Sequence, residues 1–405
     1  MSSIHTVVVG AGQAGLCASY YLSQNNIDHV VLERARVGER WRSERWDSLR
    51  FQFPNRYLHL PGFPYQGDEP EAFADRDGVV AVIDRYAEHI NAPVRCGVNV
   101  QSVARDENGC FVIETSDQTI IAKNVILATG PYQKTLIPKV GLSLPRRIRQ
   151  LPASAFTNAT ALPQGGVLVV GAGGSGVQIT EDLLEAGRDT WLCVGNFKRI
   201  PRRYAGRDIM DWFEELGLSS QPVVDRDPSD HSPLLTGVKG GYEVDLRRIV
   251  AEGGTLLGRL EGVEGEIIQL GDQLLHHMQA AEEAYDNMID GIQTALSSRS
   301  EFDGHVEPRP EAPGPMPPEP PTQLNLQDAK INSVIWSTGY GVDFSWVKVG
   351  DYLDDGSPVQ DRGVSTVPGL YYLGLFMMHT PRSSFFWGVG DDAAHIVSHI
   401  CNQDT

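Results

Sequence analysis

Apolar runs and glycine turns at the start of the chain predict a strand, a tight turn and a helix. Residues 6–9 are Thr-Val-Val-Val, a β-branched run short enough for a buried parallel strand. Residues 10–15 follow at once as GAGQAG, and residues 16–24 have the composition of a helix. A second apolar run, residues 30–33, ends in a glutamate. This order of elements is typical of a doubly wound α/β domain.

The glycine spacing of residues 10–15 is a dinucleotide-binding fingerprint, because it lies between a predicted strand and a predicted helix. Gly10 permits the tight turn, Gly12 lets a pyrophosphate approach the backbone, and Gly15 lets helix and strand pack closely. The helix N-terminus offers unpaired N–H groups to the phosphates. Glu33 lies 18 residues after Gly15, near the spacing expected of a ribose-binding carboxylate. The predicted cofactor-binding residues of this half are Gly10, Gly12, Gln13, Ala14, Gly15, Glu33 and Arg34.

A second fingerprint begins 161 residues after the first. Residues 166–170 form a predicted strand, residues 171–176 read GAGGSG, and a helix is expected over residues 177–185. Two such fingerprints predict two dinucleotide sites, one for a flavin dinucleotide and one for a nicotinamide dinucleotide. The predicted cofactor-binding residues of the second site are Gly171, Gly173, Gly174, Ser175 and Gly176.

The residues after the second fingerprint indicate which nicotinamide dinucleotide is used. The predicted strand 190–194 does not end in an acid, which would repel a 2′-phosphate. Four cations follow this strand and would attract that phosphate: Lys198, Arg199, Arg202 and Arg203. The pattern favours NADPH, with a plain solvated basic loop as the alternative.

Two further predicted strands, residues 124–130 and 332–339, both close in Thr-Gly. Each fits a strand that leaves a nucleotide-binding domain and passes near a cofactor. The residues that would face the cofactors are Thr129, Gly130, Thr338 and Gly339. Because the two strands bracket the second fingerprint, we expect the second domain to be inserted into the first. The expected domains are 1–160 with 326–405 for the first dinucleotide, and 161–325 for the second.

The chain of 405 residues carries 34 basic and 52 acidic side chains, a net charge of −18. Such a surface repels nucleic acid phosphates and anionic membranes. The hydrophobic fraction of 41% is ordinary for a globular enzyme. No apolar run approaches the roughly 18 residues of a membrane span, and no basic residue precedes Arg34, so no secretory signal is indicated. We therefore expect a cytoplasmic protein with no nucleic acid partner and no membrane span.

The whole chain resembles the class B flavin-containing monooxygenases, in particular their short bacterial branch. The resemblance rests on both fingerprints, Glu33, the turn at 38–41 (Gly-Glu-Arg-Trp), Ala128-Thr129-Gly130, Pro201-Arg202-Arg203, Ser337-Thr338-Gly339-Tyr340 and the tail at 368–374. It implies an α/β fold with two Rossmann-like dinucleotide-binding domains, the NAD(P)H domain being inserted into the FAD domain. It also implies that NADPH reduces FAD. A C4a-(hydro)peroxyflavin would then transfer one oxygen atom from O2 to a small organic substrate, by S-, N- or Baeyer–Villiger-type oxygenation.

The resemblance also implies roles for three side chains. Trp41 should lie along the ribityl chain of the flavin, and Val100 should meet the adenine through its backbone. Gln52 stands where the family often has Asn, near the C4a-peroxide. Glutamine keeps the amide donors and acceptor and is one methylene longer. Gln52 is therefore the predicted catalytic residue, with an ordinary buried polar residue as the alternative.

Three positions depart from the family pattern. Pro152 stands where the family's linker signature has His, which affects the expected coupling of the two domains. Gly195 replaces the Arg that directly follows the second strand in the family, so use of NADH is also open. Gly174 replaces a common Asn and adds backbone freedom.

Other functions have less support in the sequence. A disulfide reductase needs a redox-active cysteine pair, and the five cysteines contain no CxxC or CxxxxC. An NAD(P)H:flavin oxidase or electron-transfer reductase that releases hydrogen peroxide is the main alternative. A nucleotide-sensing interaction protein would use the proline-rich residues 308–321, which we otherwise expect to be an extended linker. One or two amphipathic helices are predicted in residues 272–298, no metal site is predicted, and a homodimer is left open.

Overall fold

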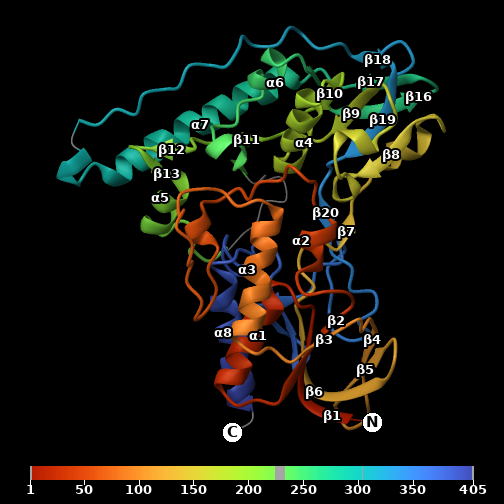
Figure 1. The fold of residues 1–405 in the computed structure, drawn as a ribbon, viewed down its shortest axis with the longest axis vertical. Coiled ribbons are helices and arrows are strands. Elements are labelled where there is room, and N and C mark those ends of the chain that lie inside the picture. Colours follow the sequence, from red (N-terminus) through yellow and green to blue (C-terminus); the bar gives the residue numbers. More distant parts are fainter. Residues whose placement is uncertain (1, 224–232, 303, 404–405) are drawn as a thin grey trace.

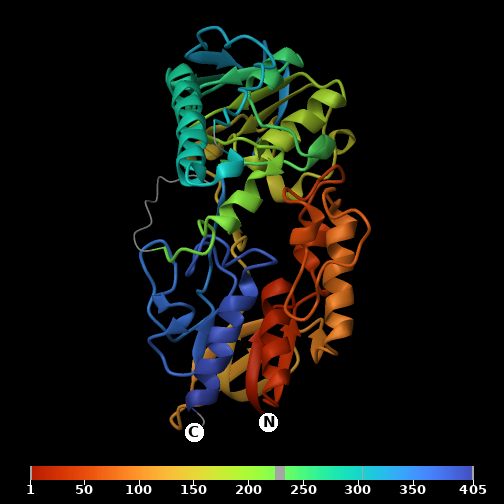
Figure 2. The ribbon, with the colours of Figure 1, turned by 90° about the vertical axis from the view of Figure 1, so that its left-hand side faces the viewer.

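The computed structural model describes residues 2–223, 233–302 and 304–403. Two α/β units lie one above the other along the long axis (Figure 1). Figure 2 shows the same division from the side, with red, orange and dark blue segments in one unit and green and cyan segments in the other. The first unit is therefore built from the N-terminal and C-terminal parts of the chain, with the second unit inserted between them.

The first unit is organised around a large mixed sheet. Strand β1 (Ser2–Val9) pairs in parallel with β6 (Thr119–Leu127) and β2 (His29–Glu33). Val7 and Val8 are completely buried, as expected for a continuous apolar run in a parallel strand. The other strands of the sheet are β3 (Val94–Cys96), β4 (Val100–Arg105), β5 (Phe111–Thr115), β21 (Gln360–Asp361), β22 (Val364–Ser365) and β23 (Leu370–Tyr372).

Helices pack on this sheet and on each other. Helix α1 (Gln13–Gln24) follows β1 directly and packs against α8 (Val389–Gln403), which places the last described helix beside the first (Figure 2). Helix α3 (Arg76–His89) is capped by Asp75, which accepts a hydrogen bond from the Gly78 N–H. The short helix α2 (Glu39–Ser43) packs against α3.

The second unit repeats the strand–turn–helix arrangement of the first. Its parallel sheet has the order β15 (Thr255–Leu257), β10 (Thr190–Cys193), β9 (Gly166–Val170), β19 (Ile331–Trp336) and β8 (Arg149–Pro152). Helix α4 (Gly174–Glu185) follows β9 as α1 follows β1. The predicted pair of Rossmann-like units, one inserted into the other, is confirmed.

Smaller elements complete the second unit. Short strands pair β11 (Lys198–Arg199) with β14 (Pro233–Leu234), β12 (Arg203–Tyr204) with β13 (Arg207–Asp208), and β17 (Ile267–Leu270) with both β16 (Leu260–Glu264) and β18 (Gln323–Asn325). Two short helices are α5 (Ile209–Glu215) and α6 (Arg247–Ala251). Among the described residues, 3-10 turns occur at Asn55–Tyr57, Lys139–Ser143, Ala153–Ala155, Ala159–Ala161, Val238–Gly240 and Ser300–Phe302.

One long helix, α7 (Leu274–Leu296), occupies the region predicted to hold one or two amphipathic helices, and it buries an apolar stripe. Residues 305–321 run outside α7 without helix or strand and return to β18 (Figure 1). Arg309 ties this extended segment to α7 through ion pairs with Glu282 and Asp286. None of the described helices, α7 included, has both the length and the apolarity that crossing a membrane requires.

The two units are joined by a small ribbon. Strands β7 (Lys134–Thr135) and β20 (Tyr340–Gly341) pair antiparallel, so the chain enters and leaves the second unit at one place. Strands β8 and β19 lie outside the range 161–325 that the sequence indicates, yet both pair within the second sheet. We therefore propose that the second unit spans residues 136–339.

Candidate functional site

A cavity of about 1500 Å3 is lined by residues of both units. Its wall includes residues that directly follow β1 and β9, so the carboxyl ends of both parallel sheets open into it. The predicted cofactor-binding residues in its wall are Gly10, Gly12, Gln13, Ala14, Glu33, Arg34, Trp41, Val100, Thr129, Gly130, Gly171, Gly173, Gly174, Ser175, Thr338 and Gly339. Gln52, the predicted catalytic residue, lines it as well. This cavity is the candidate site.

The first glycine turn has the backbone geometry that its sequence requires. Gly10 has a φ of +107°, and a Cβ there would lie 2.6 Å from the Ala128 carbonyl oxygen. A Cβ at Gly15 would lie 1.9 Å from the Gly10 carbonyl oxygen, so any side chain would push α1 away from its strand. At Gly12 the space is open, which leaves the backbone accessible to a phosphate.

The second glycine turn repeats this geometry. Gly171 has a φ of +106°, and a Cβ there would lie 2.3 Å from the Ser337 carbonyl oxygen. A Cβ at Gly176 would lie 1.9 Å from the Gly171 carbonyl oxygen, while the space at Gly173 is open. Both turns therefore fit a pyrophosphate against a helix N-terminus.

Glu33 ends β2 at the wall of the cavity and is 9% exposed. Its Oε2 accepts a hydrogen bond from the Ala11 N–H (2.9 Å), and its Oε1 accepts one from the Ala35 N–H (2.9 Å). The Val98 N–H donates to the Glu33 carbonyl oxygen (2.9 Å), which brings the segment leading to Val100 alongside. At this end of the cavity, a bound ribose would lie near Glu33 and a bound adenine near Val100.

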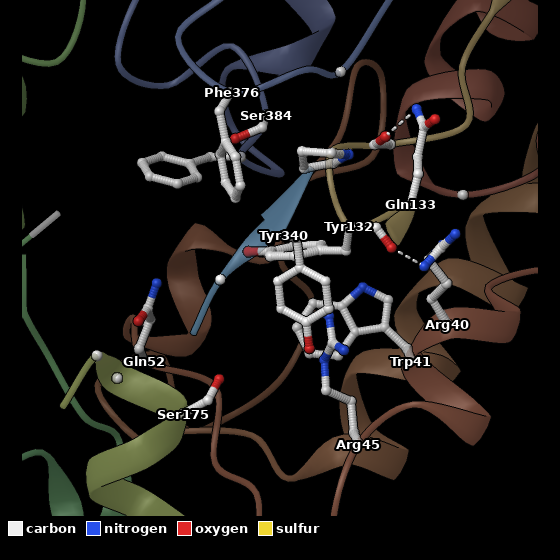
Figure 3. A pocket seen from close by; sticks show the side chains of 18 of the residues that line it. Arg40, Trp41, Arg45, Gln52, Tyr132, Gln133, Ser175, Tyr340, Phe376 and Ser384 are labelled. Atoms are coloured by element: carbon white, nitrogen blue, oxygen red, sulfur yellow. Dashed lines mark hydrogen bonds between the residues drawn. The ribbon is translucent and has the colours of Figure 1, made fainter. Parts of the chain in front are cut away.

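Trp41, on α2, forms a stacked wall with Arg45 and Tyr132 (Figure 3). The guanidinium carbon of Arg45 lies 5.2 Å from the ring centroids of both aromatic side chains. Arg40 donates a hydrogen bond to the Tyr132 carbonyl oxygen. Burial raises the pKa of Tyr132, so its hydroxyl stays protonated at neutral pH. A flat ring system placed here would meet a rigid aromatic surface.

Both Thr-Gly segments face the cavity, and hydrogen bonds tie each one to the linker region. The Gln133 side-chain amide donates to Thr129 Oγ1 (2.8 Å) and to the Gly130 carbonyl oxygen (2.8 Å). The Thr338 hydroxyl donates to the carbonyl oxygen of Leu136. The strand ends that leave the two sheets are therefore held together at the cavity wall.

Gln52 belongs to a loop of the first unit that reaches the second glycine turn. A Cβ built at Gly174 would lie 3.9 Å from Gln52 Oε1, so the amide lies near the start of α4. Figure 3 shows Gln52 close to Ser175 and apart from the stack at Trp41. An amide in this position can donate to, or accept from, a group held between the two turns.

The wall around Gln52 is apolar and largely aromatic. Phe51 packs edge-on against Phe386 with ring centroids 5.8 Å apart, and Phe53 packs against Trp387 at 4.9 Å. The second unit contributes further apolar lining residues: Met210, Phe213, Leu218, Leu235 and Met288. This end of the cavity favours an apolar guest and disfavours bulk water.

The structure does not bring the predicted phosphate-binding cations to the cavity. The side chain of Arg199 is 4% exposed, and its guanidinium pairs with Glu243, with Glu282 at 2.5 Å and with Asp245 at 3.5 Å. Three carboxylates already pair with this buried cation. We therefore propose that Arg199 does not hold the 2′-phosphate.

Arg202 and Arg203 are also engaged elsewhere. Arg202 is 2% exposed and pairs with Asp208 at 2.5 Å, while Arg203 donates to the Gly241 carbonyl oxygen at 2.8 Å. Lys198 lies on β11 and, like these arginines, is absent from the cavity wall formed by the described residues. The three arginines therefore bond to other groups of the protein, and we propose that the 2′-phosphate is held elsewhere.

Asn196 and Arg259 are among the polar residues of the second unit that line the cavity and that the sequence did not indicate. Asn196 follows β10, and the exposed Arg259 follows β15. A Cβ at Gly195, which also lines the cavity, would meet open space. The signal that could have found Arg259 is the apolar run at 255–257, because parallel strands bring their carboxyl ends to the same edge of a sheet.

Among the described residues that line this cavity there is no reactive cysteine. All five cysteines lie in the described part of the chain and are free. Burial raises the pKa of the Cys17 thiol well above its usual range and that of Cys193 to about 12. The thiolate is the reactive form, so these two side chains are inert at neutral pH.

Comparisons with known proteins agree with this geometry. A family model described as pyridine nucleotide-disulphide oxidoreductase matches residues 7–203. The chain is 30% identical to an uncharacterized CzcO-like oxidoreductase of Geobacillus kaustophilus, over 99% of each protein. It is 26% identical to the probable indole-3-pyruvate monooxygenase YUCCA1 of Arabidopsis thaliana, over 98% of this chain and 89% of that protein. A flavin-containing monooxygenase from Stenotrophomonas maltophilia has the same fold, with a TM-score of 0.70, 19% identity and 100% of both chains covered.

Two dinucleotide turns on nested Rossmann-like units, together with the full-length relatives, place the chain among the flavin-containing monooxygenase-like oxidoreductases. The resemblance seen in the sequence is therefore confirmed. Within that class, the chain belongs to the family of the CzcO-like oxidoreductases, which it matches over its full length.

The corrected position of Arg199 predicts a stability effect without coenzyme selectivity. Arg199→Met should lower the free energy of unfolding by about 1.5–3 kcal/mol, because Glu243 loses its cation while Asp245 and Glu282 keep Arg247. Thermal unfolding should show a lower Tm, while KM for NADPH and KM for NADH change by the same factor. Arg203→Met, which removes bonds to turn carbonyls, is the control. A selective rise in KM for NADPH in Arg199→Met would contradict the corrected placement.

Proposed function

We propose that the chain is an FAD-dependent, NADPH-using monooxygenase that transfers one oxygen atom from O2 to a small organic substrate. FAD would occupy the first turn, with Glu33 at its ribose and Val100 near its adenine. NADPH would occupy the second turn, against Gly173 and Ser175. One observation carries this proposal: two equivalent dinucleotide turns open onto a single cavity whose wall around Gln52 is apolar and largely aromatic. Sulfur, nitrogen and carbonyl oxygenation are all compatible with it.

Bound FAD would supply the redox chemistry, taking a hydride from the nicotinamide and activating O2. The chain contributes position, polarity and exclusion of water. The stack of Trp41, Arg45 and Tyr132 fixes the orientation of a ring system on the first-unit side. The aromatic wall at Phe53 and Trp387 keeps water from the reacting centre. Gln52 adds a hydrogen-bonding group to this dry surface, where such a bond is strongest.

The alternative is an oxidase or electron-transfer reductase that uses the same cofactors and releases hydrogen peroxide. The two functions differ in how NADPH consumption is coupled to product. A panel of sulfides, amines, indoles and ketones should contain a compound that accelerates NADPH oxidation and is oxygenated with little free peroxide. If every compound leaves one peroxide per NADPH, the oxidase is correct. The cytoplasmic location and the homodimer stay predictions.

Gln52 provides the sharpest test of the site. Gln52→Ala should leave FAD content near normal, because the amide lies at the second glycine turn and apart from the stack at Trp41. The rate of flavin reduction should also stay near normal, because hydride transfer does not require this amide. The substitution should increase the hydrogen peroxide formed per NADPH, since a hydrogen bond in a dry pocket is lost. Gln52→Asn should fall between, because it keeps the amide with a shorter reach. Stopped-flow absorbance and a peroxide assay measure the two quantities. A collapse of flavin reduction would instead place the amide at the nicotinamide.

Glu33 should determine FAD affinity. Loss of charge-assisted hydrogen bonds to a ribose costs about 1.5–3 kcal/mol, so Glu33→Ala should bind FAD roughly 10- to 100-fold more weakly. Titration of the flavin-free protein with FAD measures this directly. Glu114→Ala, a surface change on β5 of the same sheet, is the matched control. Equal FAD affinity in both variants would remove Glu33 from the cofactor site.

Arg259 is the cation best placed for the 2′-phosphate of NADPH. Arg259→Ala should raise KM for NADPH roughly tenfold or more and leave KM for NADH nearly unchanged, because NADH lacks the phosphate. Arg203→Ala should change neither selectively. Steady-state kinetics with NADPH and with NADH measure the two KM values. If Arg259→Ala raises both KM values equally, Arg259 does not contact the phosphate.

A further inference from the structure

Arg202 joins the inserted unit to the loop that carries Gln52. Arg202 follows β11 in the second unit and is 2% exposed. Its Nη1 donates to the Gln52 carbonyl oxygen (2.8 Å) and to the Thr236 carbonyl oxygen (3.4 Å), and its Nη2 pairs with Asp208 Oδ2 (2.5 Å). The guanidinium carbon also lies 4.8 Å from the ring centroid of Phe73. One buried side chain thus bridges the two units.

The turn beside Arg202 packs tightly against the same loop. A Cβ built at Gly237 would lie 1.9 Å from the Phe51 carbonyl oxygen and 2.9 Å from Phe73. A Cβ at Gly241 would lie 2.5 Å from the far end of the Phe73 ring. These contacts leave the backbone at Phe51 and Gln52 almost no room to shift toward the second unit.

The other end of the loop is also held by the second unit. Asp211, on α5, accepts hydrogen bonds from Arg56 Nη2 (2.7 and 2.8 Å to its two oxygens) and from the Tyr57 hydroxyl (2.8 Å). Residues 51–57 belong to the first unit, yet they are anchored at both ends by the second. At the Gln52 end, the anchor is a guanidinium bonded to a backbone carbonyl.

We propose that Arg202 is a positioning residue that fixes the Gln52 amide in the cavity. The planar guanidinium reaches Gln52, Thr236 and Asp208 together, which a lysine ammonium on a flexible stem cannot do. The Phe73 ring packs against the guanidinium group and fixes the orientation of its plane. Arg202 therefore links the docking of the two units to the placement of the amide. The consequence for oxygen transfer rests on the function proposed above, whereas the placement of the loop does not.

Arg202→Lys and Arg203→Lys form a matched pair. Arg203 donates to the carbonyl oxygens of Gly240 and Gly241 within the second unit, so it tests a nearby arginine without the contact to Gln52. In flavin-free protein, hydrogen exchange of the peptide covering residues 51–57 should be roughly tenfold faster in Arg202→Lys, the change expected for loss of about one buried hydrogen bond. Arg203→Lys should exchange like the parent protein. Equal exchange in all three proteins overturns the proposal.

The second readout is the fraction of NADPH oxidation that ends as hydrogen peroxide. Arg202→Lys should raise this fraction severalfold without changing FAD affinity, and it should add nothing further in a Gln52→Ala background, because both changes act on one group. Independent effects of the two changes overturn the positioning role. If exchange rises in Arg202→Lys while Gln52→Ala stays fully coupled, the placement stands and the proposed role of Gln52 fails.

A milder variant covers the case in which Arg202→Lys does not fold. Phe73→Leu removes the ring beneath the guanidinium, keeps an apolar side chain and leaves Arg202 in place. It should also accelerate exchange over residues 51–57. Unchanged exchange in Phe73→Leu then overturns the proposal.

Discussion

Both nucleotide turns depend on one steric constraint, the close approach of a helix to the strand that precedes it. At Gly15 and at Gly176, a Cβ would lie 1.9 Å from the carbonyl oxygen of the first glycine of the same turn. A hydrogen atom is all that fits, so each helix begins close to the end of its strand, where a helix N-terminus can bind a phosphate. The residues that follow β1 and β9 line one cavity, so the carboxyl ends of both sheets face the same space.

The buried arginines of this acidic chain bind groups of the protein itself and so stabilise the fold. Among 34 basic and 52 acidic side chains, a cation has many carboxylates within reach. Arg199 holds α7 against β11 through Glu282, and Arg202 joins the second unit to the loop at Gln52. A buried arginine with these partners is costly to remove and unavailable to a phosphate. The exposed Arg259 is in a different situation, because it lies on the cavity wall.

The apolar end of the cavity is assembled from parts that are distant in sequence. Glu214 on α5 accepts hydrogen bonds from Trp387 Nε1 (2.7 Å) and from Arg382 (2.8 Å), which ties the second unit to the segment before α8. Asp211 on the same helix holds Tyr57. Docking of α5 therefore shapes the wall around Gln52, and a shift between the units would move both the aromatic wall and the amide. The inserted unit therefore contributes both the second glycine turn and part of the cavity wall around Gln52.

The sequence by itself determined the two fingerprints, the insertion of one unit into the other and the amphipathic α7, because these follow from local patterns of glycine, β-branched and apolar residues. It also placed Glu33 and Trp41 at the cavity, since each follows closely on an element that the pattern predicts. It did not determine the limits of the second unit, because β8 and β19 pair with each other between residues 184 positions apart in the chain. Only the tertiary structure decided which arginines face the cavity: Arg199 meets Glu282 through a contact 83 residues distant, whereas Arg259 reaches the wall from the end of β15. A charge pattern gives the sign of a side chain, but its partner is set by long-range packing: Arg199 pairs within the second unit, whereas Arg202 bonds to the loop of the first unit.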